Sequence, residues 1–169
     1  MPIRLDDYDL NILDELQNRG RQSNADLAEK VHLSASQCLR RVRRLEEQEV
    51  IRSYAALLNP EALGLGIQAF IHITLEKHDE DPAKVFSEEI KDWEEVLACW
   101  AITGDTDYLM HVVAPNLKIF SELVLKRLLA QPMVASVKSS ILLEELKATN
   151  VLPSTHLEET LNKRVKVDP

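Results

Sequence analysis

The apolar residues change from helical spacing to strict alternation between about residue 50 and residue 67, and that change constrains the fold more than any other feature. Up to about residue 50 the apolar side chains recur every three or four residues, which is typical of amphipathic helices. From Ile67 to Leu75 they occupy every second position, which indicates a strand with one buried face. A segment rich in Pro and Gly, residues 59–66, separates the two patterns. We therefore expect two small domains of different type in the 169 residues.

The first part predicts three short helices. Leu10, Leu13 and Leu16 mark the first helix, and Ser23 and Ser34 are candidate N-caps of the second and third. The third helix is expected from Ala35 to about Gln48, with an apolar stripe of Ala35, Cys38, Leu39, Val42 and Leu45. The next run, residues 50–58, predicts a strand that would turn a helix-turn-helix into its winged variant.

Charge is unevenly distributed along the chain, whose formal net charge is −8. Residues 1–53 hold nine Lys and Arg against ten Asp and Glu, so most of the excess acid lies further on. Four of the nine basic residues fall within 40–44, on the expected outer face of the third helix, which suits the major groove of DNA. The alternative is a three-helix domain with a solvated basic face and no DNA role. The candidate DNA-binding residues are Ser34, Ser36, Gln37, Arg40, Arg41, Arg43 and Arg44. Arg40 and Arg44 are the first choices for DNA contact, and Gln37 is the first choice for reading a base.

The second part predicts the order β-α-β-β-α-β, the ferredoxin-like arrangement. Strands are expected over 67–75, 96–103, 108–113 and 134 to about 146, with helices capped by Asp81 and Asn116. Both helices would cover one face of the sheet, leaving Phe70 and His72 on an open face. An open face with apolar content is usually covered, most simply by a second copy of the chain.

Motifs of catalysis and metal binding are missing from the sequence. It contains no G-x-G-x-x-G, no Walker loop and no H-E-x-x-H among its five histidines. Cys38 and Cys99 are too few for a disulfide framework, and no apolar run approaches the roughly 20 residues that span a bilayer. We expect a cytoplasmic protein that is not an enzyme, needs no cofactor or metal and does not bind membranes.

Several segments resemble one known family. Residues 5–13, 20–28 and 33–46 are similar to the N-terminal domain of the Lrp/AsnC (feast/famine) regulators, and residues 102–110 resemble that family's Gly-Asp-x-Asp-Tyr motif. The resemblance spans about residues 3–150. It implies an α+β chain: an N-terminal winged helix-turn-helix followed by a ferredoxin-like βαββαβ domain for ligand binding and dimerisation.

The resemblance also implies domain boundaries, partners and an effector site. The expected regions are 1–53 for DNA binding, 54–66 as linker and hinge, 67–149 as the amino-acid-responsive oligomerisation domain and 150–169 as a tail. The expected partners are double-stranded DNA, an amino-acid effector and further copies of the chain, as homodimers and an octamer of four dimers. The effector residues carried over are Thr103, Gly104, Asp105, Asp107, Tyr108, Ser139 and Ser140. For Asp105 and Asp107 an equal alternative is a turn-forming role.

Two other readings of the whole chain stay open at this point. One is an architectural DNA-binding protein that responds to no effector. The other is an amino-acid-binding regulatory module that does not bind DNA.

Two positions depart from the family pattern. His32 and Glu49 stand where family members often have glycine, in the turn before the third helix and in the turn after it. A left-handed backbone at a non-glycine residue costs on the order of 1 kcal/mol. We therefore expect altered turn geometry at these positions and no change of fold.

Overall fold

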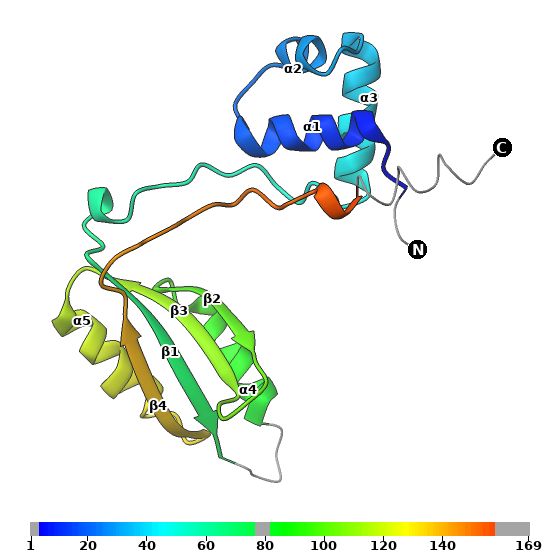
Figure 1. Cartoon of the computed structure of the whole chain (residues 1–169). Coiled ribbons are helices and arrows are strands. Elements are labelled where there is room, and N and C mark those ends of the chain that lie inside the picture. Colours follow the sequence, from blue (N-terminus) through cyan, green and yellow to red (C-terminus); the bar gives the residue numbers. More distant parts are fainter. Residues whose placement is uncertain (1–3, 77–81, 158–169) are drawn as a thin grey trace. The chain divides into compact units, whose positions relative to one another are not determined.

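The computed structural model describes residues 4–76 and 82–157, which fall into two compact units (Figure 1). One unit combines the chain up to Leu57 with the segment that begins at Lys147, and the other is Leu58–Leu146. Residues 147–157 therefore belong with the helical domain and not with the sheet that precedes them.

Three helices form the first unit, and a side-chain cap starts each of them: α1 (Asp7–Asn18), α2 (Asn24–Lys30) and α3 (Ala35–Glu47). Capping boxes at Asp6, Ser23 and Ser34 satisfy backbone N–H groups at the helix starts, which confirms the two predicted serine caps. The apolar stripes meet in a core that includes Ile12, Leu27, Cys38 and Leu45. Ala35, expected on the inner stripe of α3, is exposed because it is the first residue of the helix and lies beyond that core.

The strand predicted over residues 50–58 is wrong, since this segment has no regular secondary structure. The N–H groups of Val50 and Ile51 both donate to the carbonyl of Leu45, so the segment starts as the turn that ends α3. A strand needs a neighbour to accept its remaining backbone hydrogen bonds, and no strand pairs with these residues in the described part of the chain.

Residues 152–157 of the C-terminal tail lie against α1. The N–H of Leu152 donates to Gln17 Oε1 at 2.7 Å, and Gln17 Nε2 donates to the carbonyl of Leu152 at 3.3 Å. Together with α1 and residues 50–54, the tail lines a mostly apolar groove of about 430 Å³. The helix suggested by the sequence from Thr155 onward begins there, and its continuation lies outside the described residues.

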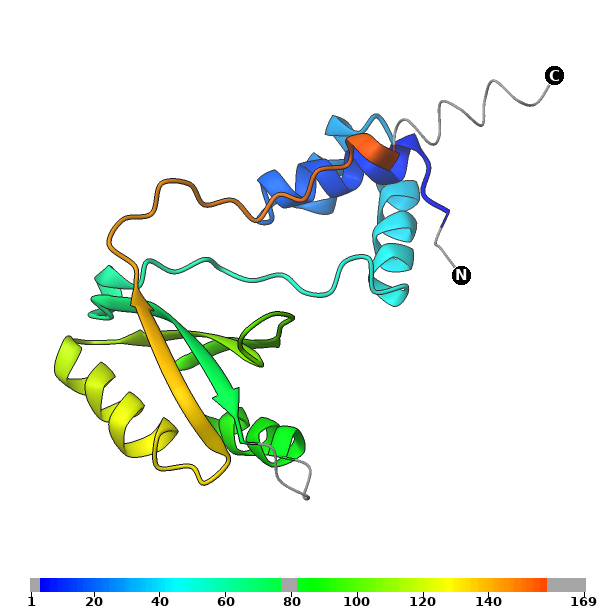
Figure 2. The same ribbon diagram turned by 60° about the horizontal axis from the view of Figure 1, so that its bottom comes forward.

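The second unit is a four-stranded antiparallel sheet with strand order β2-β3-β1-β4 (Figure 2). Its strands are β1 (Ile67–Leu75), β2 (Val96–Ala101), β3 (Tyr108–Ala114) and β4 (Val134–Ile141). Its helices are α4 (Pro82–Glu89) and α5 (Leu117–Glu122), the latter continuing as a π-helical turn over Leu123–Leu128. This is the predicted ferredoxin-like order.

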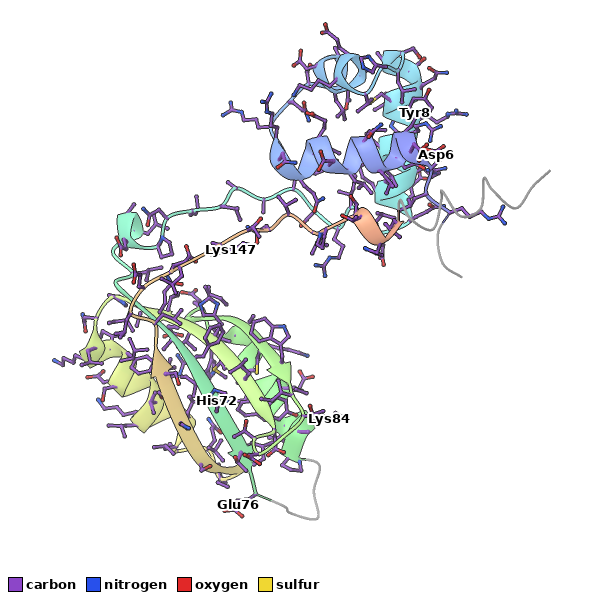
Figure 3. All side chains as sticks on the ribbon, viewed as in Figure 1. Asp6, Tyr8, His72, Glu76, Lys84 and Lys147 are labelled. Carbon is purple, nitrogen blue, oxygen red and sulfur yellow. The ribbon has the colours of Figure 1, made fainter. Side chains whose placement is uncertain are left out.

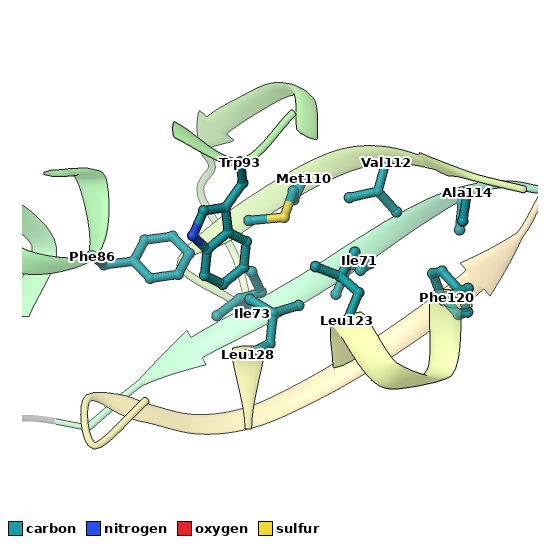
Figure 4. Close-up of a cluster of buried hydrophobic side chains, with 11 residues drawn as sticks. Ile71, Ile73, Phe86, Trp93, Met110, Val112, Ala114, Phe120, Leu123 and Leu128 are labelled. Atoms are coloured by element: carbon teal, nitrogen blue, oxygen red, sulfur yellow. The ribbon is translucent and has the colours of Figure 1, made fainter. Parts of the chain in front are cut away.

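The core of the second unit lies between one face of the sheet and the two helices (Figure 4). Ala69, Ile71 and Ile73 of β1 are fully buried there, which confirms that the odd-numbered side of this strand faces the helices. Phe86 from α4 and Phe120 from α5 close the core from the other side. Phe70 and His72 lie on the opposite face and are half-buried, as predicted.

Two strands end earlier than the sequence predicted, and one predicted helix cap cannot be compared with the structure. Strand β4 stops at Ile141 and not near residue 146, and its last backbone hydrogen bond to β1 runs from the N–H of Leu142 to the carbonyl of Gln68. Strand β2 stops at Ala101, since the N–H of Ile102 already belongs to the following turn. The predicted cap Asp81 lies outside the described residues.

None of the helices in residues 4–76 and 82–157 is long and apolar enough to cross a bilayer.

Candidate functional site

The turn that joins α2 to α3 is built around a left-handed residue. His32 has a φ of 56°, and the N–H of Leu33 donates to the carbonyl of Ala28 at 2.9 Å, which closes the end of α2. Glu49 also has a φ of 56° at the end of α3. Both non-glycine residues therefore adopt the costly left-handed conformation, so the altered turn geometry expected from the sequence does not occur. The helix-turn-helix forms around them.

The basic run of α3 is divided between two environments. Arg40 and Arg43 are exposed, and neither forms an ion pair or hydrogen bond within the described residues. Arg41 and Arg44 instead point toward α1. All four guanidiniums line one shallow depression of about 550 Å³, together with Ser36 and Asp6 among others.

Two carboxylates of the α1 start hold the inward arginines. Arg41 Nη1 donates to Asp6 Oδ2 at 2.8 Å and to Asp9 Oδ1 at 2.8 Å, while Arg44 Nη2 donates to Asp9 Oδ2. The guanidinium of Arg41 also lies over the ring of Tyr8, 5.3 Å from its centroid; Asp6 and Tyr8 are labelled at this end of α1 in Figure 3. Burial raises the pKa of Asp6, but the N–H of Asp9 and the guanidinium of Arg41 outweigh it, so the pKa of this carboxyl lies below its usual value.

The polar residues at the start of α3 serve the cap. Ser34 Oγ accepts from the N–H of Gln37, and Gln37 Oε1 accepts from both the N–H and the hydroxyl of Ser34. Ser36 Oγ lies 3.2 Å from Ser34 Oγ. Gln37 Oε1 is therefore engaged in the cap, whereas its Nε2 has no hydrogen-bond partner among the described residues. Bidentate recognition of adenine requires both atoms, so in this conformation only Nε2 is available to a base.

The Gly-Asp-x-Asp-Tyr segment forms the turn between β2 and β3. The N–H of Asp107 donates to the carbonyl of Ile73, and Asp107 Oδ2 accepts from the N–H of Leu75 at 2.8 Å. Gly104 has a φ of 118°, a conformation that side chains rarely permit. Asp107 thus fastens the turn to the end of β1, while Thr103 and Asp105 are exposed and have no hydrogen bond or ion pair within the described residues.

The remaining effector candidates do not all gather at this turn. Tyr108 packs its ring on Phe86, with 5.0 Å between centroids, and lies opposite Ile73 in the sheet. Ser139 and Ser140 are on β4, on the far side of β1 from Tyr108, opposite Ile71 and Phe70. Because neighbouring residues of a strand point to opposite faces, these two serines line opposite sides of the sheet.

The open face of the sheet carries an aromatic surface. Phe70 and His111 are stacked with 5.0 Å between ring centroids, and Trp100 on β2 is 48% exposed. His111 Nε2 is buried without a hydrogen-bond partner in the described part of the chain, and burial lowers the pKa of this histidine. His72 is two residues from Phe70 on the same strand, and no group of His, Cys, Asp and Glu able to hold a metal occurs among the described residues.

The sequence reasoning missed the carboxylates of Asp6 and Asp9 as partners of the α3 arginines. The two sets lie 32 to 35 residues apart, and nothing local in the sequence joins them. An acidic cluster at the start of α1 was the only available signal, and helix capping explains it equally well.

The sequence matches two family models and many known proteins. Residues 68–152 match the Lrp/AsnC ligand-binding domain, and residues 5–52 match winged helix-turn-helix DNA-binding domains. The leucine-responsive regulatory protein of Rhizobium meliloti (strain 1021) is 41% identical over 145 residues, which cover 86% of this chain and 93% of that protein. The protein of the same name from Escherichia coli (strain K12) is 40% identical over 148 residues, covering 88% and 90%.

Solved structures agree with the sequence matches. A transcriptional regulator from Neisseria meningitidis, crystallised in complex with L-Met, superposes with a TM-score of 0.88 and is 44% identical, covering 91% of this chain and 99% of that chain. An AsnC family transcriptional regulator from Agrobacterium tumefaciens gives a TM-score of 0.83 at 35% identity, covering 90% and 99%.

A helix-turn-helix with a basic third helix, joined to a four-stranded sheet that carries both its helices on one face, defines a DNA-binding regulator with a separate ligand-binding domain. The chain belongs to the Lrp/AsnC family of transcriptional regulators. The predicted family and fold class are therefore confirmed. The exception is the wing strand, which does not form among residues 50–58.

Proposed function

We propose that α3 enters the major groove of double-stranded DNA and contacts it first through Arg40 and Arg43. The observation that supports this is the division of the basic run: these two guanidiniums are exposed and unpaired within the described residues, while Arg41 and Arg44 are engaged by carboxylates. Ser34 and Ser36 stand at the helix start, where hydroxyls and backbone N–H groups reach phosphates. Gln37 reads a base edge through its Nε2.

The test is a double substitution, Arg40→Ala with Arg43→Ala, on an operator selected from random duplexes by the wild-type protein. Loss of two phosphate or base contacts lowers the slope of log affinity against log salt by up to about 2. Arg19→Ala with Arg21→Ala is the matched control, because it removes the same charge from exposed positions outside α3. Equal effects of the two doubles would mean that α3 is not the contacting helix.

We also propose that an amino acid binds at the turn between β2 and β3. The exposed carboxylate of Asp105 receives the ammonium group of the ligand, and the hydroxyl of Thr103 with the turn N–H groups receives its carboxylate. Gly104 provides the open backbone, since no atom lies within 4 Å of where its side chain would begin. The complex of the Neisseria meningitidis regulator with L-Met supports an amino acid as the class of ligand.

Thermal shift with each of the twenty amino acids, L-Met first, tests this site. A stabilising amino acid is expected, and Asp105→Asn should abolish its effect while leaving the unliganded melting temperature unchanged. Asp107→Ala is the contrasting variant, because it lowers the melting temperature by removing the oxygen that accepts the N–H of Leu75 in β1. A protein that binds DNA and responds to no amino acid would be an architectural DNA-binding protein. One that binds an amino acid and no duplex would be a regulatory module only.

For assembly, we propose that two chains pair through the open face of the sheet and that four such dimers form an octamer in the cytoplasm. The aromatic surface of Phe70, Trp100 and His111 supports the first step, and two free cysteines support a reducing compartment. Light scattering measures the particle mass. Phe70→Asp should yield monomers, whereas Leu125→Asp on the helical side should leave the dimer intact; a wild-type monomer would overturn the symmetric arrangement.

A further inference from the structure

We infer that Asp6 and Asp9 limit sequence-independent DNA binding by withholding Arg41 and Arg44 from phosphates. This inference rests on the proposed contact between α3 and DNA, and it concerns which of the four arginines contribute charge to that contact. The carboxylates thereby act as specificity-determining residues without touching a base.

Burial makes the ion pair of Asp9 hard to exchange. The side chain of Asp9 is 1% exposed, yet both of its oxygens accept from a guanidinium, Oδ1 from Arg41 and Oδ2 from Arg44. A phosphate that captured either arginine would leave this carboxylate uncompensated in the protein interior, which is strongly unfavourable. Phosphates in solution or on DNA therefore compete poorly for these two side chains.

Asp6 secures Arg41 from the other side. Both of its oxygens lie within 2.9 Å of Arg41 Nη1, and its backbone N–H and side chain also complete the capping box of α1 with Asp9. The ring of Tyr8 covers the same guanidinium, whose side chain is only 20% exposed. The arginine is thus held by a carboxylate pair and an aromatic ring at once.

The formal charges of Asp6, Asp9, Arg41 and Arg44 cancel. Of the four arginines of α3, only Arg40 and Arg43 therefore present a guanidinium charge that no carboxylate engages among the described residues. Sequence-independent affinity for DNA comes almost entirely from cations that neutralise phosphates. Halving the number of arginines available to phosphates weakens binding to DNA of any sequence. Base contacts made by the unpaired Arg40 and Arg43 are retained.

The experiment compares the salt dependence of binding to a random-sequence duplex for wild type, Asp6→Asn and Asp9→Asn. Asparagine at position 6 preserves the N-cap, and asparagine at position 9 preserves the shape of the buried side chain. We expect the slope of log affinity against log salt to steepen by about 1 for Asp6→Asn and by about 1 to 2 for Asp9→Asn. Affinity for the random duplex should rise, and the ratio of operator to random affinity should fall.

Asp7→Asn is the matched control, because Asp7 is exposed on the same turn and holds no arginine among the described residues. It removes the same charge without releasing a guanidinium, so its slope should equal that of wild type. A second check adds Arg41→Gln and Arg44→Gln to Asp9→Asn, which should restore the wild-type slope. A purely structural role of Asp9 would weaken binding to both duplexes and leave the slope unchanged.

Each outcome separates the inference from the function on which it rests. If wild type binds neither operator nor random duplex, the proposed DNA contact fails. If wild type binds and all three asparagine variants show its slope of log affinity against log salt, the inference that Asp6 and Asp9 mask the arginines is wrong. The inference is also wrong if Asp7→Asn steepens that slope as much as Asp9→Asn does. If circular dichroism shows that Asp9→Asn does not fold, Asp6→Asn alone decides, since its side chain is half-exposed and its cap is retained.

Discussion

The two units of this chain hold their polar groups in opposite ways. In the helical unit a fully buried carboxylate, Asp9, lies beside the apolar core and fixes the helix that carries the basic face. In the sheet unit every member of the buried core is apolar, and the polar residues proposed to bind the effector lie in the turn between β2 and β3. In this chain, therefore, the basic helix is fixed by a buried ion-pair network, whereas the turn is fixed by two hydrogen bonds between Asp107 and β1.

The largest expected effect is loss of the sheet core. Phe86→Ala removes a fully buried ring that packs on Tyr108, so it should lower the free energy of unfolding of the sheet unit by about 3–5 kcal/mol. Urea denaturation measures the change, with the neighbouring and exposed Val85→Ala as control. An effect of Phe86→Ala no larger than that of Val85→Ala would contradict the description of this core.

The corresponding change in the helical unit is Asp9→Ala. This substitution leaves two guanidiniums without their shared acceptor, and breaking a fully buried ion pair costs roughly 3–5 kcal/mol. Because both guanidiniums retain some exposure to water, we expect a smaller loss of unfolding free energy, about 2 kcal/mol. Thermal unfolding followed by circular dichroism checks it against Asp7→Ala. If the two variants melt together, the network does not stabilise the contact between α1 and α3.

A smaller effect should distinguish the two aspartates of the turn. Asp107→Ala removes the hydrogen bond from the N–H of Leu75, which is worth about 0.5–1.5 kcal/mol. Asp105→Ala should leave the free energy of unfolding unchanged and affect only ligand binding. Equal stability of both variants in urea would show that the turn is held by its backbone alone.

The two units should also lose stability in different pH ranges. Burial lowers the pKa of His111, so the folded state binds fewer protons than the unfolded chain, whose pKa is near 6.5. This contribution is complete above pH 6.5 and is lost as the pH falls toward the folded value. The net lowering of the pKa of Asp6 gives a contribution present above pH 3.8 and lost as the pH falls through the folded pKa below it.

Melting temperatures from pH 3 to 8 measure both contributions. His111→Gln should flatten the curve just below pH 6.5, and Asp6→Asn should flatten it below about pH 4. The titratable and basic neighbours on the open face, His72 and Lys138, are unchanged in both variants. An unaltered curve for His111→Gln would mean that this histidine is as solvated in the assembled protein as in the unfolded chain.

Local signals made most of the fold predictable. Ser23, Ser34 and Asn116 each cap the helix that they were expected to cap, because a cap depends on residues three positions away. The alternation from Ile67 to Leu75 likewise predicted the buried face of β1. The strand over residues 50–58 failed because its apolar composition does not reveal whether a partner strand exists.

The candidate sites were less predictable because they depend on contacts between distant residues. Nothing near Arg41 or Arg44 in the sequence shows that Asp6 and Asp9 engage them, so Arg44 was preferred together with Arg40 as a first DNA contact although a carboxylate holds it. Similarly, Ser139 and Ser140 were carried over together by resemblance, although their adjacency on a strand sends them to opposite faces. The contact between Gln17 and Leu152 spans 135 residues and left no trace in the pattern.

The division of the arginines on α3 is the central claim, and one comparison tests it most directly. The salt slope of operator binding is measured for Arg40→Ala with Arg43→Ala and for Arg41→Ala with Arg44→Ala. We predict that the first double lowers the slope by up to about 2, and that the second leaves it near the wild-type value while lowering the melting temperature. The reverse order, with the larger loss of slope in the second double, would contradict the account.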